Sequence, residues 1–106
     1  MKEYHVKITR RAALDMEAIY RYIADELQAP ENAMGQYNRI ADAVLSLANM
    51  PSRCALVHFQ PERSMGFRQL TVDNYLIVFV LDGDDATVIR ILYGASDLAK
   101  RMHKER

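Results

Sequence analysis

The chain has 106 residues, of which half are hydrophobic and 26% are charged. This length and balance are typical of a single globular domain, here spanning residues 1–106, that builds its own core without a disulfide. The 14 basic and 14 acidic residues cancel, which disfavours a protein that binds nucleic acid by non-specific phosphate attraction, although a local basic patch is compatible with it.

The single cysteine, Cys54, excludes an intramolecular disulfide and is interpreted as a small core residue. The N-terminus lacks the apolar segment of a signal peptide, and no apolar run approaches the roughly 18 residues that span a membrane. The histidines and the cysteine lack the spacing of metal ligands, and there is no glycine-rich phosphate loop. We therefore expect a cytoplasmic protein with no membrane partner, no metal and no cofactor.

The first half of the chain predicts one strand followed by two helices. Apolar and polar residues alternate from Tyr4 to Thr9, which is typical of a strand with one apolar face. From Arg10 to Gln28 the apolar residues recur every three or four positions, so a helix is expected. Pro30 suits the first turn of a second helix, and Pro51 should end it because the residue before a proline avoids the helical region. Since very few residues join the helices, they should form an antiparallel hairpin.

After an irregular segment, the second half predicts a three-stranded antiparallel meander between Gly66 and Gly94. Two turn signals divide it, Asp73-Asn74 and Asp82-Gly83-Asp84-Asp85, whose residue types tolerate the positive φ of tight turns. The middle strand, Tyr75–Leu81, is apolar throughout, which is typical of a strand that is covered on both faces.

The order of these elements predicts an α+β fold, in which the helices pack on one side of a mostly antiparallel sheet. The N-terminal strand should pair at an edge of the meander. In the tail from Ala95 to Arg106, Ser96 is a possible N-cap and basic residues predominate. A short C-terminal helix is expected there, with a frayed basic end as the alternative.

Two arginines interrupt apolar strands of the meander. Arg68 needs an anionic partner or a route to water, so it either clamps a phosphate or carboxylate or forms a structural ion pair, for example with Asp73 or Glu62. Arg90 is expected to share a strand face with Val88 and Leu92. It needs an anionic partner in the same way, and the further alternative is that its side chain reaches water from an edge strand.

Tyr93 stands at the end of the last predicted strand, a place where binding sites are common. Its ring either stacks on a base, donates a proton, or packs as an ordinary strand aromatic. On the irregular segment, His58 and Glu62 form a possible acid–base pair, and a solvated histidine is the alternative.

Several segments in a characteristic order cover nearly the whole chain. They are Tyr4–Thr9 leading to Ala13–Ile19, Tyr22–Ala24, Leu47–Pro51, Gly66–Leu70, Asn74–Phe79 and Val88–Gly94. In this order and spacing the chain resembles the RelE/ParE superfamily of type II toxin–antitoxin toxins. It is most similar to the ParE-type and plasmid-stabilisation branch, which has a long helical hairpin.

The resemblance implies a growth-inhibiting toxin that a cognate antitoxin neutralises. ParE-like members bind and poison DNA gyrase, whereas RelE-like members cut mRNA in the ribosomal A site without a metal. Arg68 matches the arginine that the family commonly carries after the glycine of its first meander strand. Arg90 and Tyr93 match the last strand and its end.

One departure from the family concerns the segment after the last strand. Relatives often carry one or two arginines between a histidine or tyrosine and an aspartate, whereas this chain reads Tyr93-Gly94-Ala95-Ser96-Asp97. RNA cleavage needs a proton acceptor, a proton donor and cations for the phosphate. For these roles the chain offers at most Arg68, Arg63 and Tyr93.

From the resemblance we assign Arg68 and Tyr93 as candidate catalytic residues, and Arg63 and Arg90 as candidate binding residues. The expected partners are an antitoxin and a target, either DNA gyrase or ribosome-bound mRNA. Gyrase inhibition is the favoured mechanism. A metal-independent mRNA endonuclease and a degenerate toxin that retains only antitoxin binding are the alternatives, so enzymatic activity stays open.

Overall fold

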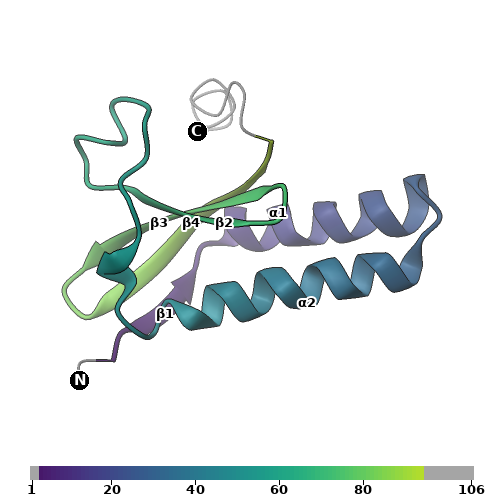
Figure 1. The fold of residues 1–106 in the computed structure, drawn as a ribbon, viewed down its shortest axis with the longest axis horizontal. Helices are drawn as coiled ribbons and strands as arrows, with labels where there is room; N and C mark the ends of the chain where they lie inside the picture. The colour runs from purple at the N-terminus through teal and green to yellow at the C-terminus, as the bar shows by residue number, and fades with distance from the viewer. Residues whose placement is uncertain (1–2, 95–106) are drawn as a thin grey trace.

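The architecture of the chain, described over residues 3–94 by a computed structural model, is a helical hairpin packed on a four-stranded sheet (Figure 1). Its elements are β1 (His5–Ile8), α1 (Arg10–Arg21), a π-helical segment (Tyr22–Glu26), α2 (Pro30–Ser46), a 3₁₀ turn (Pro51–Arg53), β2 (Arg68–Val72), β3 (Tyr75–Asp82) and β4 (Asp85–Tyr93). None of the helices within this range combines the length and hydropathy of a membrane span. The predicted tail helix lies outside the described residues.

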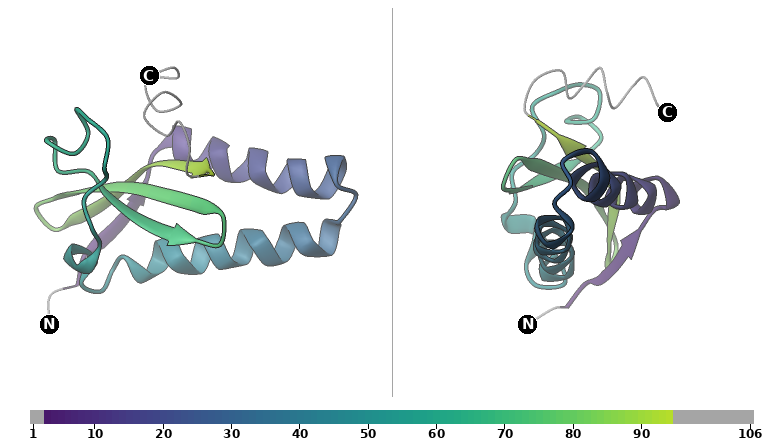
Figure 2. Two further views of the ribbon diagram at one scale, coloured as in Figure 1. Left: turned by 45° about the horizontal axis from the view of Figure 1, so that its top comes forward. Right: turned by 90° about the vertical axis from the view of Figure 1, so that its right-hand side faces the viewer.

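The predicted antiparallel hairpin is confirmed. Helices α1 and α2 run side by side, and their far end extends past the sheet (Figures 1 and 2). Tyr20 and Tyr37 join them through an edge-to-face contact with ring centroids 6.2 Å apart. Gln28 takes the left-handed conformation, with φ of 50°, and reverses the chain into Pro30 at the start of α2.

Helix α2 ends at Ser46, earlier than the position before Pro51 that the sequence predicted. The chain leaves the helix because its next residues contact the N-terminal strand. The N–H of Tyr4 donates to the carbonyl of Ala48 at 2.8 Å, and Glu3 forms an antiparallel bridge with Asn49. Contacts with the beginning of the chain, rather than the proline, therefore set this boundary.

The sheet has the strand order β1-β4-β3-β2, which confirms both the meander and the edge position of the first strand. Strands β2, β3 and β4 are antiparallel, and β1 pairs parallel to β4, with His5 opposite Asp85 and Ile8 opposite Val88. Asp73 and Gly83, in the two hairpin turns, have positive φ, as predicted.

Strand β3 is covered on both faces, as its unbroken apolar run predicted, and its residues 75–79 are all buried. On one face the core combines β3 and β4 with the helices and includes Met16, Ile40 and Phe79. On the other face the irregular segment supplies Val57 and Phe67, which pack on residues of β3 and β4.

A register shift between Val78 and Phe79 places Val78 opposite Arg90 and Phe79 opposite Val88. The intervening residue, Ile89, is the extra residue of a bulge, and the alternation along β4 changes phase there. Arg90 therefore shares its face with Leu92 but not with Val88, contrary to the simple alternation expected from the sequence.

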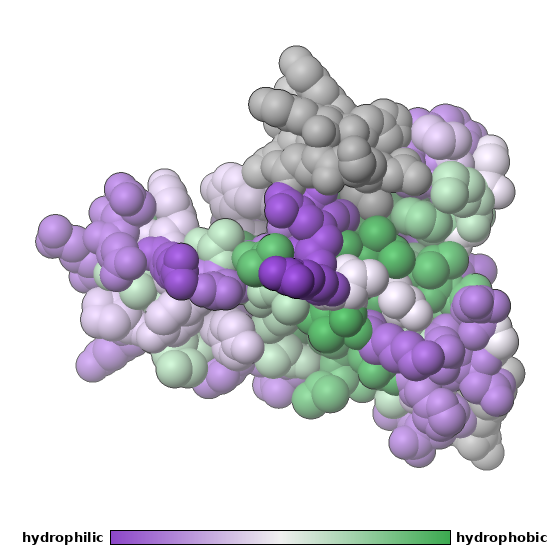
Figure 3. All heavy atoms as spheres, turned by 180° about the vertical axis from the view of Figure 1, so that it is seen from behind, coloured by the Kyte–Doolittle hydropathy of each residue, from purple (hydrophilic) through white to green (hydrophobic). Residues whose placement is uncertain are grey.

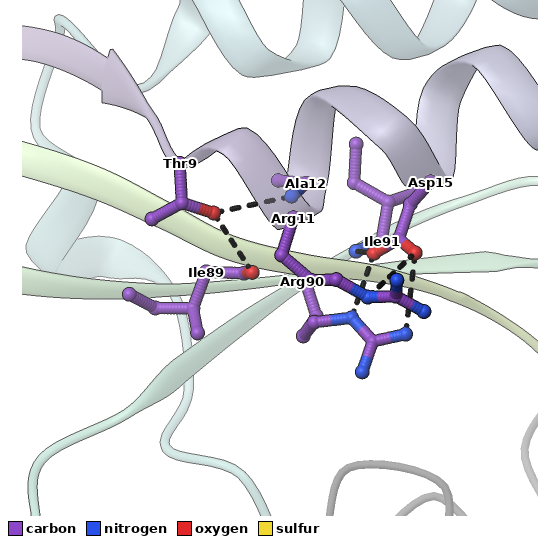
Figure 4. A network of polar contacts seen from close by, with 7 residues as sticks. All are labelled: Thr9, Arg11, Ala12, Asp15, Ile89, Arg90 and Ile91. Carbon is purple, nitrogen blue, oxygen red and sulfur yellow. Dashed lines mark hydrogen bonds and ion pairs between the residues drawn. The ribbon is translucent and has the colours of Figure 1, made fainter. Parts of the chain in front are cut away.

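The strand that carries Arg90 is not an open edge, so the expected route to water is wrong. Arg90 is only 5% exposed, and its Nε and Nη2 donate to the two carboxylate oxygens of Asp15 at 2.8 and 3.2 Å (Figure 4). The same carboxylate accepts a bond from the backbone N–H of Ile91 at 2.9 Å. Helix α1 thus covers the part of β4 that extends beyond β1.

We predict that Asp15→Asn lowers the free energy of unfolding by about 3 kcal/mol, because it leaves a buried guanidinium without its counter-charge. Urea unfolding at neutral pH measures the change. The matched control is Glu17→Gln on the same helix, because the ion pair of Glu17 with Arg21 is exposed. The control should cost only a few tenths of a kcal/mol. Equal effects of the two substitutions would contradict the importance of the buried pair.

Candidate functional site

Arg68 lies at the start of β2 and forms neither of the ion pairs considered from the sequence. Its Nη1 donates to the backbone carbonyls of Cys54 at 2.6 Å and Ser52 at 3.3 Å. Ser52 lies within the 3₁₀ turn, and Cys54 directly follows it. The guanidinium therefore anchors this segment to the sheet, and its catalytic role stays a prediction.

Arg63 has a similar local contact, because its Nη1 donates to the carbonyl of Val57 at 3.1 Å. His58 is exposed while Glu62 is fully buried, so the possible acid–base pair is not formed. Cys54 is buried, and burial raises the pKa of its thiol, as suits a core residue. Within residues 3–94, no cluster of histidine, cysteine and carboxylate side chains has the makings of a metal site.

Tyr93, at the end of β4, is exposed, as is Arg63. The Tyr93 side chain is 55% exposed, and its ring meets that of Tyr75 edge to face at 5.3 Å. Tyr93 lies opposite Tyr75 in the sheet, whereas Arg68 lies opposite Phe79. These partners are about 13 Å apart along β3, so the two candidate catalytic residues occupy opposite ends of the meander.

A groove with a volume of about 700 Å³ lies where the hairpin meets the sheet end that carries Tyr93. We call it the hairpin groove. It is lined by Ala18, Ile19, Tyr22, Ile23, Leu27, Asn32, Gln36, Arg39, Asn74, Tyr75 and Tyr93. Tyr22 and Leu27 are each 56% exposed, and Tyr93 is 55% exposed. Exposed apolar surface of this kind commonly marks an interaction site.

The resemblance led us to expect an antitoxin along apolar grooves of the sheet and hairpin, but the sequence did not identify the lining residues, because they come from both helices and two strands. The π-helical segment contributes Tyr22 and Ile23, and Leu27 follows directly. Such segments are frequent at functional sites. The sequence feature that could have indicated the groove is Tyr22, an aromatic side chain beside the apolar stripe of the first helix.

A polar contact closes one side of the hairpin groove. In the turn between β2 and β3, Oδ2 of Asp73 accepts bonds from Nε of Arg39 at 2.8 Å and from Nε2 of Gln36 at 3.0 Å. These bonds lower the pKa of the Asp73 carboxyl, and the bond from Arg39 has a larger effect than the bond from Gln36. The contact ties α2 to the tip of the meander.

Two further hollows are smaller than the hairpin groove. One, of about 370 Å³, includes His58, Thr71 and Tyr93 but none of the arginines at positions 63, 68 and 90. The other, of about 430 Å³, lies between β1 and the hairpin and includes Ile8, Met16 and Tyr20. Figure 3 shows apolar side chains gathered near the middle of the back of the molecule.

Comparison with known proteins gives a consistent result. The model of the family described as ParE toxin of type II toxin–antitoxin system, parDE, matches residues 6–98. A solved structure of the chromosomal ParDE system from P. aeruginosa is 26% identical, with a TM-score of 0.74, and the match covers 90% of this chain and 100% of that chain. No curated protein matches the chain.

A more distant likeness concerns the fold alone. The toxin–antitoxin complex RelBE2 from Mycobacterium tuberculosis is 15% identical, with a TM-score of 0.63, and the match covers 91% of this chain and 97% of that chain. Its agreement confirms the predicted α+β arrangement of strand, hairpin and meander.

We predict that Arg39→Gln raises the pKa of Asp73 towards its ordinary value, because the charged donor is lost. A folded-state pKa below the unfolded one contributes stability above the unfolded pKa, and this contribution is lost as pH falls through the folded pKa. Wild type should therefore lose more stability than Arg39→Gln on acidification. Carbon-detected NMR titration of the Asp73 carboxyl measures the shift, and an unchanged titration in the variant would contradict the contact.

Proposed function

The chain belongs to the family of ParE toxins of type II toxin–antitoxin systems, and from this premise we propose that it inhibits bacterial growth by binding DNA gyrase. A cognate antitoxin neutralises it. The proposed target and the lack of disulfides both fit a cytoplasmic protein. The observation that carries the choice of mechanism is the separation of its candidate catalytic groups.

Binding without catalysis fits the positions of the arginines. Arg68 and Arg63 each donate to backbone carbonyls, and Arg90 is buried against Asp15. Phosphate stabilisation in RNA cleavage requires cations that converge on one point beside an acid and a base. These guanidinium groups instead stabilise the fold at separate places, and Tyr93 lies at the far end of the meander from Arg68.

Ribosome-dependent mRNA cleavage is the second candidate. The observation in its favour is that His58 and Tyr93, two groups able to transfer protons, line the same hollow. A degenerate toxin that only binds its antitoxin is the third candidate, since Ala95 and Ser96 stand where relatives often carry arginines.

We place the antitoxin in the hairpin groove. The groove is largely apolar, and three of its side chains, Tyr22, Leu27 and Tyr93, are more than half exposed. A partner segment that covers them gains the free energy of removing apolar surface from water. The far end of the hairpin extends past the sheet (Figure 2), and the π-helical segment there contributes Tyr22 to the groove.

The mechanism predicts inhibition of gyrase supercoiling by the purified toxin, with ribosome-bound transcripts left intact. Gel assays of plasmid supercoiling and primer extension on translated mRNA measure the two activities. Tyr93→Phe removes the phenolic proton donor but keeps the ring, so supercoiling inhibition should change by less than about threefold, whereas an acid catalyst would lose 10²-fold or more. Cut transcripts that disappear in Tyr93→Phe would favour the endonuclease instead. Failure to inhibit growth in any assay would favour the degenerate toxin.

The docking proposal predicts that Leu27→Ser weakens antitoxin binding about tenfold, because an apolar contact of roughly 1–2 kcal/mol is lost. The matched control is Leu45→Ser, since Leu45 is 66% exposed and lies outside the groove. Isothermal titration calorimetry with the antitoxin encoded beside the toxin gene gives both affinities. Equal affinities for the two variants would place the antitoxin elsewhere.

A further inference from the structure

The charge of the hairpin groove is carried by one side chain. Among the described residues that line it, Arg39 is the only charged one, and the others are apolar or uncharged polar side chains. Its counter-ion, Asp73, lies outside the lining, on the adjoining turn. A partner that enters the groove therefore meets a positive charge on an apolar wall.

The guanidinium of Arg39 has one occupied edge and one open edge. Its Nε donates to Asp73 at 2.8 Å and its Nη2 donates to Oε1 of Gln36 at 3.3 Å, so both bonds use the side of the group that carries Nε. No bond within residues 3–94 uses Nη1. The end formed by Nη1 and Nη2 presents two parallel N–H donors, which match the two oxygens of a carboxylate.

Covering the groove makes this open edge costly. The Arg39 side chain is 57% exposed and the Asp73 side chain 43% exposed, so water now satisfies the remaining donors. An apolar segment that displaces this water leaves guanidinium N–H groups without acceptors, which opposes binding. A carboxylate on the segment removes that cost and adds a charge-assisted bond.

We propose that the antitoxin segment in the hairpin groove carries an aspartate or glutamate that binds the Nη1–Nη2 edge of Arg39, between apolar side chains that contact Tyr22 and Leu27. This inference rests on the proposed docking of the antitoxin in the groove. Asp73 keeps its hydrogen bond to Nε of Arg39. The incoming carboxylate therefore binds the other edge of the guanidinium and does not displace Asp73. Arg39 thereby distinguishes the cognate segment from equally apolar segments that lack the acid.

The test is a charge exchange between the toxin and the antitoxin encoded beside its gene. Arg39→Glu should weaken the complex by about 30-fold or more, because it opposes two carboxylates in a desolvated site. One Asp→Lys or Glu→Lys substitution in the antitoxin should restore affinity for Arg39→Glu while weakening binding to the wild-type toxin. Calorimetry at low and high salt measures each pair.

Two control variants and a folding check separate charge recognition from structural damage. Arg21→Glu removes an exposed arginine of α1 that does not line the groove and should change affinity less than threefold. Asp73→Asn loosens the turn without touching the open edge and should leave affinity unchanged or slightly higher. Circular dichroism of Arg39→Gln and Arg39→Glu checks that both fold.

The outcomes are distinguishable. If Arg39→Glu folds and binds within threefold of wild type while Leu27→Ser binds weakly, the groove is the docking site and the carboxylate proposal is overturned. The proposal is likewise overturned if no substitution of an acidic antitoxin residue by lysine restores binding to Arg39→Glu. It is also overturned if Asp73→Asn weakens binding as much as Arg39→Glu does. If Leu27→Ser and Arg39→Glu both bind normally, the docking proposal itself fails.

Discussion

The carboxylate of Asp15 is the contact on which the arrangement of hairpin and sheet depends. Strand β1 spans only four residues, so the second half of β4 extends beyond its neighbour and would present unpaired backbone groups. Helix α1 supplies their partners, since Thr9 donates its hydroxyl to the carbonyl of Ile89 and Asp15 accepts the N–H of Ile91. The same carboxylate neutralises the buried Arg90. Helix α1 and its N-cap therefore cover the exposed edge of β4. The same contacts of Thr9 and Asp15 fix the direction of the helix relative to the sheet.

That direction positions the interaction surface. With α1 held against β4 at its first turns, the continuation of the helix extends past the sheet and carries Tyr22 and Leu27 over the end where Tyr75 and Tyr93 stack. The contact of Arg39 with Asp73 holds α2 to the tip of the meander on the other side. The hairpin groove thus adjoins the Arg39–Asp73 contact and includes the rings of Tyr75 and Tyr93, and its apolar surface lies beside one positively charged side chain.

Most of the secondary structure followed from local signals, because periodicity and turn residues are properties of the chain itself. The unbroken apolar run of β3 and the turn residues Asp73 and Gly83 were sufficient to predict the centre of the sheet. The end of α2 and the phase of β4 were not predictable in this way. A contact with Tyr4 ends the helix early, and a bulge at Ile89 shifts the alternation.

The chain by itself determined the α+β fold through its hydrophobic patterning and turn residues, and its segments resemble the ParE family, to which the family comparison assigns it. The partners of its arginines were decided only by the tertiary structure. Asp15 and Arg90 are 75 positions apart, and Arg39 meets Asp73 across 34 positions. Sequence shows that a charge within an apolar strand needs compensation, but the compensating group is chosen by packing in three dimensions. The groove has the same origin, because its walls come from helices and strands that approach one another only in the folded chain.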